Sequence, residues 1–178
     1  MPVVASSAQV AGIDLQEQAT VGTRELSLNG AGLRRKVFFN VYVAGLYLTE
    51  KRQSAAEVLA LAGPKRISIT LMRDLSVRKL VEGLTGGVRG NSSPEEHAAV
   101  KDRVGEVAAM LLAVQQGREG DVITLDWLPD AGTLVSVNGE IKGQAVPGDD
   151  VYRALLGVWL GDHPTSTGLK RALLGQTE

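Results

Sequence analysis

The chain has 178 residues, of which 44% are hydrophobic, and this is enough to form the core of one ordinary domain. Its formal net charge is −1 and its pI is about 6.2, so the chain as a whole shows no electrostatic sign of nucleic-acid or anionic-membrane binding. It contains no cysteine, which excludes disulfides, thiolate metal sites and a cysteine nucleophile. No apolar run approaches the roughly 20 residues that a membrane-spanning helix needs.

The N-terminal segment is small, apolar and uncharged. We expect residues 1–8 to be either a flexible N-terminus or the remnant of an export signal, because the basic and long apolar regions of a complete signal are missing. The two alternatives predict different locations for the protein, and the sequence upstream of residue 1 would distinguish them.

The next part of the chain has the period-two pattern of β-strands. Weak alternation predicts a hairpin over residues 10–21 and a further strand over residues 24–28. The segment 29–32, NGAG, is typical of a turn or of a place where two backbones approach closely.

A long segment, residues 34–50, is largely apolar at both odd and even positions. This predicts one strand that is covered on both faces and lies in the middle of a sheet. Two polar side chains within it, Asn40 and Tyr42, would then be buried, and a buried polar group needs a partner or a ligand.

The remaining segments alternate between helical and strand periodicity, and a glycine-rich stretch separates two of the helices. In chain order, we expect a helix over 54–61, a strand over 65–73, a helix over 75–84, a loop over 85–93, a helix over 94–116, three short strands between 122 and 146, and helices over 148–160 and 169–174. This order predicts an α+β fold with an antiparallel β-sheet and helices packed on one face.

The motifs of the common enzyme classes are missing. His97 and His163 are the only histidines, and neither has the spacing of a metal site. No phosphate-binding glycine loop or nucleophile elbow is present. The sequence therefore predicts no metal and no cofactor.

The basic cluster Arg34-Arg35-Lys36 opens the long strand. All three side chains are either solvated at a sheet edge, or Arg34 points inward and binds an anion. In the second case a tyrosine hydroxyl beside the guanidinium would complete a carboxylate clamp, and an apolar cleft would hold the rest of an amphipathic ligand. Eight residues of straight strand would separate Arg34 from Tyr42 by roughly 26 Å. The clamp therefore requires the chain to double back near residues 35–38.

Two stretches, NGAGLRRKVFFNVYVAGLYL and LLGVWLGDHPTSTGLKRALLG, resemble the chalcone isomerase family, specifically its bacterial chalcone-isomerase-like branch. Smaller matches are the RD pair at 73–74 and the SSPEE sequence that opens the long helix. The resemblance covers almost the whole chain and implies a single domain over residues 9–175. It also implies an open-faced sandwich with an elongated ligand cleft between the sheet and a layer of helices.

The family contains isomerases, which close a chalcone to a flavanone, and non-enzymatic relatives that bind fatty acids. By this resemblance, Arg34 matches the arginine that both branches use for the anionic end of the ligand, and Tyr42 matches a tyrosine of the fatty-acid-binding branch. Glu96 falls near the active-site tyrosine of the isomerases. Val158 and Trp159 fall where the isomerases place residues beside the substrate ring. These departures favour binding over catalysis.

We therefore expect a non-catalytic protein that binds a small amphipathic carboxylate, such as a fatty acid, in an apolar cleft. The predicted ligand-binding residues are Arg34, Tyr42, Phe38, Asn40, Glu96, Val158 and Trp159. One alternative is an intramolecular lyase that acts on a chalcone, with Arg34 as its catalytic residue. Another is a structural or partner-binding module whose cleft is filled by its own side chains.

The expected partner is a fatty acid or a flavonoid-like molecule, with no nucleic acid, no metal and no membrane span. A periplasmic or secreted location is expected, because bacterial relatives often carry export signals, and a cytoplasmic location is the alternative.

Overall fold

The computed structural model describes residues 6–176, which form a seven-stranded antiparallel sheet of order β11-β10-β9-β6-β5-β4-β3. Its strands are β3 (Gln18–Val21), β4 (Arg24–Lys36), β5 (Phe39–Leu48), β6 (Lys65–Leu71), β9 (Val122–Leu128), β10 (Gly132–Val137) and β11 (Glu140–Ile141). Two small antiparallel sheets pair β1 (Ser7–Val10) with β2 (Ile13–Gln16) and β7 (Leu75–Ser76) with β8 (Gln116–Gly117).

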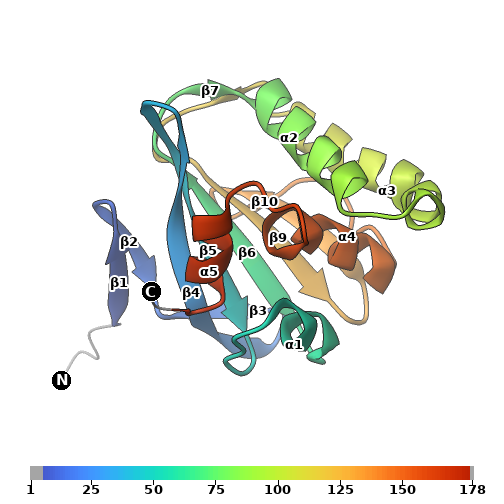
Figure 1. The fold of residues 1–178 in the computed structure, drawn as a ribbon, viewed down its shortest axis with the longest axis horizontal. Helices are drawn as coiled ribbons and strands as arrows, with labels where there is room; N and C mark the ends of the chain where they lie inside the picture. Colours follow the sequence, from blue (N-terminus) through green and yellow to red (C-terminus); the bar gives the residue numbers. More distant parts are fainter. Residues whose placement is uncertain (1–5, 177–178) are drawn as a thin grey trace.

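The helices are α1 (Ala55–Ala60), α2 (Val77–Gly90), α3 (Pro94–Leu112), α4 (Asp149–Leu160) and α5 (Thr167–Leu173). They gather on one side of the curled sheet (Figure 1). The predicted α+β fold, an antiparallel sheet with helices on one side, is confirmed. No helix within residues 6–176 is long and apolar enough to cross a membrane.

Strand β5 carries the core on both of its faces. Tyr42, Ala44, Leu46 and Leu48 point to the main core beneath the helices. Tyr47 points to the opposite face, where it packs with residues of β3 and β4, and its hydroxyl donates to the backbone oxygen of Gln16 at 2.7 Å. All of residues 42–48 are buried, and β5 pairs with β4 on one side and β6 on the other. The prediction of a two-sided central strand is confirmed for this segment.

The prediction that residues 34–50 form one strand is wrong. The chain reverses at Val37-Phe38, so residues 34–36 end β4 and residues 39–48 form β5. Glycine, proline, asparagine and aspartate are the usual signals of a hairpin turn, and this turn contains none of them. The pattern therefore resembled an uninterrupted strand.

The NGAG segment lies inside β4 and forms no turn. A Cβ atom on Gly30 would overlap the carbonyl oxygen of Ala172 in α5, so glycine lets the helix lie directly on the strand. Asn29 stabilises the same contact between β4 and α5, because its side-chain amide donates to the backbone oxygen of Leu173 at 2.8 Å. The predicted close backbone approach is thus confirmed, while the turn is not observed.

The glycine-rich segment 85–93 was predicted as a loop, and this is wrong up to Gly90, because α2 continues through it. A Cβ atom on Gly87 would lie 2.9 Å from two carbon atoms of Val158, so the absence of a side chain brings α2 close to α4. Packing between helices therefore overrides the low helix propensity of glycine here.

Several boundaries also differ from those expected. Helix α3 begins with a capping box at Ser93, as its sequence indicates, but it ends at Leu112, and Gln115 beyond it has a left-handed φ of +66°. Strand β6 is buried on both faces over residues 67–71, whereas its alternation indicated a half-buried strand. The expectation for residues 1–8 falls largely on residues 1–5, which lie outside the described part of the chain, and it stays a prediction.

Candidate functional site

A cavity of about 650 Å³ lies between the sheet and the helical layer. Its walls are mainly apolar, and they come from the middle of the sheet and from the inner faces of α2, α3 and α4. The apolar lining includes Ile69, Ile123, Leu125, Leu80, Leu84, Leu111, Val158 and Trp159. The volume falls within the range of about 300–1,000 Å³ that small-molecule sites usually have.

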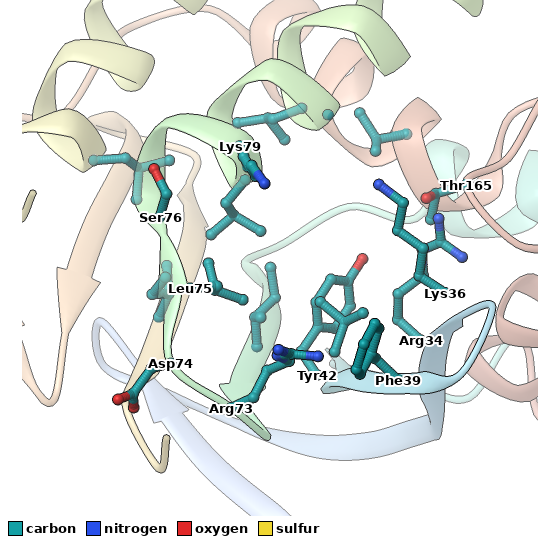
Figure 2. A pocket seen from close by; sticks show the side chains of 18 of the residues that line it. Arg34, Lys36, Phe39, Tyr42, Arg73, Asp74, Leu75, Ser76, Lys79 and Thr165 are labelled. Carbon is teal, nitrogen blue, oxygen red and sulfur yellow. The ribbon is translucent and has the colours of Figure 1, made fainter. Parts of the chain in front are cut away.

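Four cations line the same cavity, namely Arg34, Lys36, Arg73 and Lys79. Within residues 6–176, no carboxylate lies within 4.0 Å of any of them. Among the described residues, Asp74 is the only acidic one in the lining. Its carboxylate accepts the backbone N–H of Glu119 at 2.9 Å and points away from the cavity (Figure 2). The site is therefore locally positive, although the whole chain has a net charge of −1.

The β4–β5 hairpin brings Arg34 and Tyr42 together. The two residues are direct partners across the antiparallel pair, which places their Cα atoms roughly 4.5–5.5 Å apart. The condition that a carboxylate clamp imposes on the chain is thus met, because the chain doubles back between the two residues.

The Tyr42 hydroxyl is buried and points into the cavity (Figure 2). Its oxygen accepts the indole N–H of Trp159 at 2.9 Å, and it donates to no acceptor in the described part of the chain. Burial raises the pKa of this hydroxyl above its ordinary value of 10.0, and the hydrogen bond from Trp159 and the charge of Arg34 lower it by less. The phenol therefore stays protonated at neutral pH, and its proton is available to a ligand.

Arg34 is half-buried at the end of β4. One of its terminal nitrogens donates to the backbone oxygen of Arg35 at 2.6 Å, which holds the guanidinium at the base of the hairpin turn. Its remaining N–H groups make no hydrogen bond to any described residue. A guanidinium has five N–H donors, so most of them are free to bind an anion.

A β-bulge decides which residues of β5 face the cavity. Arg34 pairs with Tyr42 but Arg35 pairs with Asn40, so Val41 is an extra residue on β5. Such an insertion reverses the alternation of side chains. Phe39 and Val41 consequently line the cavity. Asn40 is exposed outside it, and the expectation that Asn40 is buried is wrong for this reason.

The other predicted site residues separate into two groups. Val158 and Trp159 line the cavity together with Arg34 and Tyr42. Phe38 is 87% exposed at the hairpin turn and, like Asn40, is not part of the lining. Glu96 is also outside the cavity.

Glu96 serves the start of α3 instead. Its carboxylate accepts the backbone N–H of Ser93 at 2.9 Å, and its own backbone N–H donates to the Ser93 hydroxyl at 3.1 Å. These bonds also hold the pKa of the Glu96 carboxyl below its usual range. The structure therefore gives this residue a role in helix capping, and its role in ligand binding stays a prediction.

Sequence analysis missed most of the polar residues of the lining, including Arg73, Ser76 and Lys79. The Arg73 guanidinium lies 4.0 Å above the ring centroid of Phe39. Ser76 precedes α2, yet its hydroxyl makes no capping hydrogen bond. Lys79 lies in the first turn of α2, where a cation is unfavourable beside the positive end of the helix dipole. The first turn of α2 contains basic residues and no acidic residue, and this pattern in the sequence could have indicated Lys79 as a site residue.

The described residues contain no group of three or more histidine, aspartate or glutamate side chains that could hold a metal ion. The chemistry that the cavity offers consists of hydrogen-bond donors, positive charge and apolar surface. This combination suits a ligand with an anionic head and an apolar body.

Comparison with known proteins identifies the family. A family model described as chalcone isomerase-like matches residues 7–175. The chain belongs to the chalcone isomerase-like family. Among solved structures, this chalcone isomerase-like protein is similar to the fatty-acid binding protein AtFAP1 of Arabidopsis thaliana, with a TM-score of 0.71 and 15% sequence identity, over 95% of this chain and 96% of that one. No curated protein matches the chain in sequence. At 15% identity the likeness to AtFAP1 shows a common fold.

Proposed function

We propose that this chalcone isomerase-like protein binds a fatty acid, or a similar amphipathic carboxylate, without catalysing a reaction on it. The observation that carries the proposal is the pairing of Arg34 with Tyr42 at an apolar cavity of about 650 Å³. Both side chains keep hydrogen-bond donors that no described residue uses.

The arrangement matches the two parts of a fatty acid. The guanidinium and the phenol can donate to the two carboxylate oxygens, and such charge-assisted bonds are about twice as strong as neutral ones. The other three cations of the lining raise the local concentration of anions. The acyl chain would occupy the apolar part, where each buried methylene group contributes about 0.8 kcal/mol. The name of AtFAP1, a fatty-acid binding protein with the same fold, supports this choice of ligand.

The cavity offers little for catalysis. Neither His97 nor His163 belongs to its lining, and the Asp74 carboxylate is already held by a backbone N–H group. The alternative, cyclisation of a chalcone, retains only the positioning and electrostatic contribution of Arg34. It is tested by following flavanone formation from a chalcone, for which we expect the rate in buffer alone. The volume of the cavity disfavours the third hypothesis, a structural or partner-binding module whose cleft is filled by its own side chains.

We also propose that the protein belongs to the bacterial branch of the family and is exported to the periplasm. The two long sequence stretches that resemble that branch and the small, uncharged N-terminal segment support this assignment. Fractionation of cells that express the protein from its genomic start codon tests it, and recovery in the cytoplasm alone would refute it.

Titration calorimetry with palmitate tests the binding proposal. We expect Arg34→Gln to weaken the affinity by roughly 10- to 150-fold, the range that corresponds to about 1.5–3 kcal/mol for a hydrogen bond to a charged group. Arg35→Gln is the matched control, because Arg35 is the next residue of β4, is exposed and does not line the cavity. Equal affinities for the two variants, or no binding by the wild-type protein, would disprove the proposal.

A further inference from the structure

The β4–β5 hairpin ends in an exposed apolar segment. Of the five large hydrophobic residues that are exposed within residues 6–176, three are consecutive here, namely Val37 (78% exposed), Phe38 (87%) and Phe39 (53%). We call residues 35–39 the hairpin tip. Figure 1 shows the turn between β4 and β5 projecting from the end of the sheet near β7.

The residues of the tip are not those that would best stabilise a hairpin turn. Val37 has a φ of +52°, a left-handed conformation that a β-branched residue rarely adopts. Asparagine or glycine would satisfy the same turn with less strain. Neither Val37 nor Phe38 belongs to the buried core, so their apolar surface contributes little to folding. Such a combination of strain and exposed apolar surface points to contact with another surface.

The charges at the tip indicate which surface this is. Arg35 and Lys36 are exposed next to the apolar residues, and neither pairs with a carboxylate in the described part of the chain. Two copies of the tip packed together would place four cations near one another, which disfavours self-association. An anionic lipid surface instead accepts apolar side chains among its acyl chains and cations at its phosphate groups, each basic residue contributing attraction.

The tip also forms part of the cavity wall. Lys36, Val37 and Phe39 belong to the lining, whereas Phe38 and Arg35 do not. A lipid surface in contact with the tip would therefore lie beside the opening of the cavity. A ligand that leaves a bilayer there would meet the cation cluster before it meets bulk water.

We propose that the hairpin tip docks on an anionic lipid bilayer, with Val37 and Phe38 inserted among the lipids and Arg35 and Lys36 at the head groups. The docked protein exchanges its ligand directly with the bilayer. This exchange rests on the proposed fatty-acid binding, whereas docking itself does not.

Sedimentation with lipid vesicles tests the docking. We expect the wild-type protein to bind vesicles of mixed phosphatidylglycerol and phosphatidylcholine, to bind pure phosphatidylcholine more weakly, and to dissociate at high salt. Phe38→Ser should weaken binding at least about tenfold, because it removes one inserted aromatic side chain. Ile141→Ser is the matched control. Ile141 is also an exposed apolar residue (57% exposed), but it lies on the edge strand β11, which three strands separate from β5, and it does not line the cavity.

Three results would overturn the docking proposal. They are no binding of the wild-type protein to the anionic vesicles, equal binding by Phe38→Ser, and a wild-type dimer in solution that Phe38→Ser abolishes. Palmitate affinity measured without vesicles separates this proposal from the proposed function. Phe38→Ser should leave that affinity unchanged, and a protein that binds vesicles but no palmitate would refute the proposed function alone.

Transfer of a fluorescent fatty acid from vesicles to the protein tests the exchange step. A docked protein takes up its ligand on collision, so the transfer rate should rise with vesicle concentration and fall in Phe38→Ser to the level of diffusion through water. A rate that is independent of vesicle concentration in the wild-type protein would refute direct exchange.

Discussion

A leucine at position 83 should shorten the acyl chain that the cavity accepts. Gly83 lines the cavity one helical turn beyond Lys79, and a Cβ atom there would meet no atom within 4 Å. A leucine side chain would therefore extend into free space and displace about four methylene groups of a ligand. At about 0.8 kcal/mol for each methylene group, the loss is about 3 kcal/mol, or roughly 200-fold in affinity for an acid that fills the cavity.

The assay is titration calorimetry with a series of saturated acids from octanoate to stearate. In Gly83→Leu we expect weak binding of the longest acids and almost unchanged binding of acids that are about four carbons shorter. Gly86→Leu is the matched control, since Gly86 lies on the same helix, also has open space around it and does not line this cavity. In either variant the leucine should stabilise helix α2 by about 0.8 kcal/mol relative to glycine, so misfolding would not explain a difference between them. The reasoning is refuted if both variants behave alike, or if Gly83→Leu weakens all chain lengths equally.

Two further predictions concern the buried tyrosines. Tyr42→Phe removes one donor to the ligand and leaves the Trp159 indole N–H without its acceptor. Palmitate affinity, measured by calorimetry, should fall roughly 10-fold or more, and the unfolding free energy, measured by urea unfolding, should fall by about 1–3 kcal/mol. An unchanged affinity together with an unchanged unfolding free energy would contradict the site. Burial raises the pKa of Tyr42, Tyr47 and Tyr152 in the folded state, so the unfolded chain loses these protons at lower pH than the folded protein does. The unfolding free energy should therefore be constant with respect to these groups below about pH 10. Above that pH it should fall by up to about 1.4 kcal/mol per pH unit for each tyrosine. Urea unfolding between pH 8 and 11 measures this slope, which Tyr152→Phe should reduce; a slope that this variant leaves unchanged would rule out the contribution of Tyr152.

The fold class was predictable because it depends on periodicity that burial enforces. Residues 42–48 are aliphatic or aromatic apart from Gly45, and the structure buries every one of them. The hairpin between β4 and β5 was not predictable from local pattern, because Val37 and Phe38 are strand-forming residues with no turn preference. The turn forms there because pairing of β4 with β5 and packing of both strands outweigh the local cost.

The candidate site was predictable only where a side chain's role does not depend on register. The sequence brought Arg34 and Tyr42 together on condition that the chain reverses between them. The structure contains this reversal and places both residues in one cavity lining, while their binding of a ligand stays a prediction. Asn40 was placed on the wrong side, because a one-residue bulge opposite Arg34 reverses the side chains of β5 beyond it, whereas Phe38 lies in the hairpin turn and not on a strand. No feature of a single sequence reveals such a bulge. The cation Lys79 was accessible to sequence reasoning, since it opposes the dipole of its own helix.

The central claim is that the Arg34 guanidinium neutralises a carboxylate at the opening of an apolar cavity. Native mass spectrometry of the protein after incubation with an equal mixture of fatty acids, repeated after denaturation, tests this claim most directly. We predict a complex of one chain with one fatty acid that denaturation releases. Arg34→Gln should form much less of this complex, and Arg35→Gln should form as much as the wild-type protein. A wild-type spectrum that shows only the free chain, or a complex that Arg34→Gln retains in full, would contradict the account.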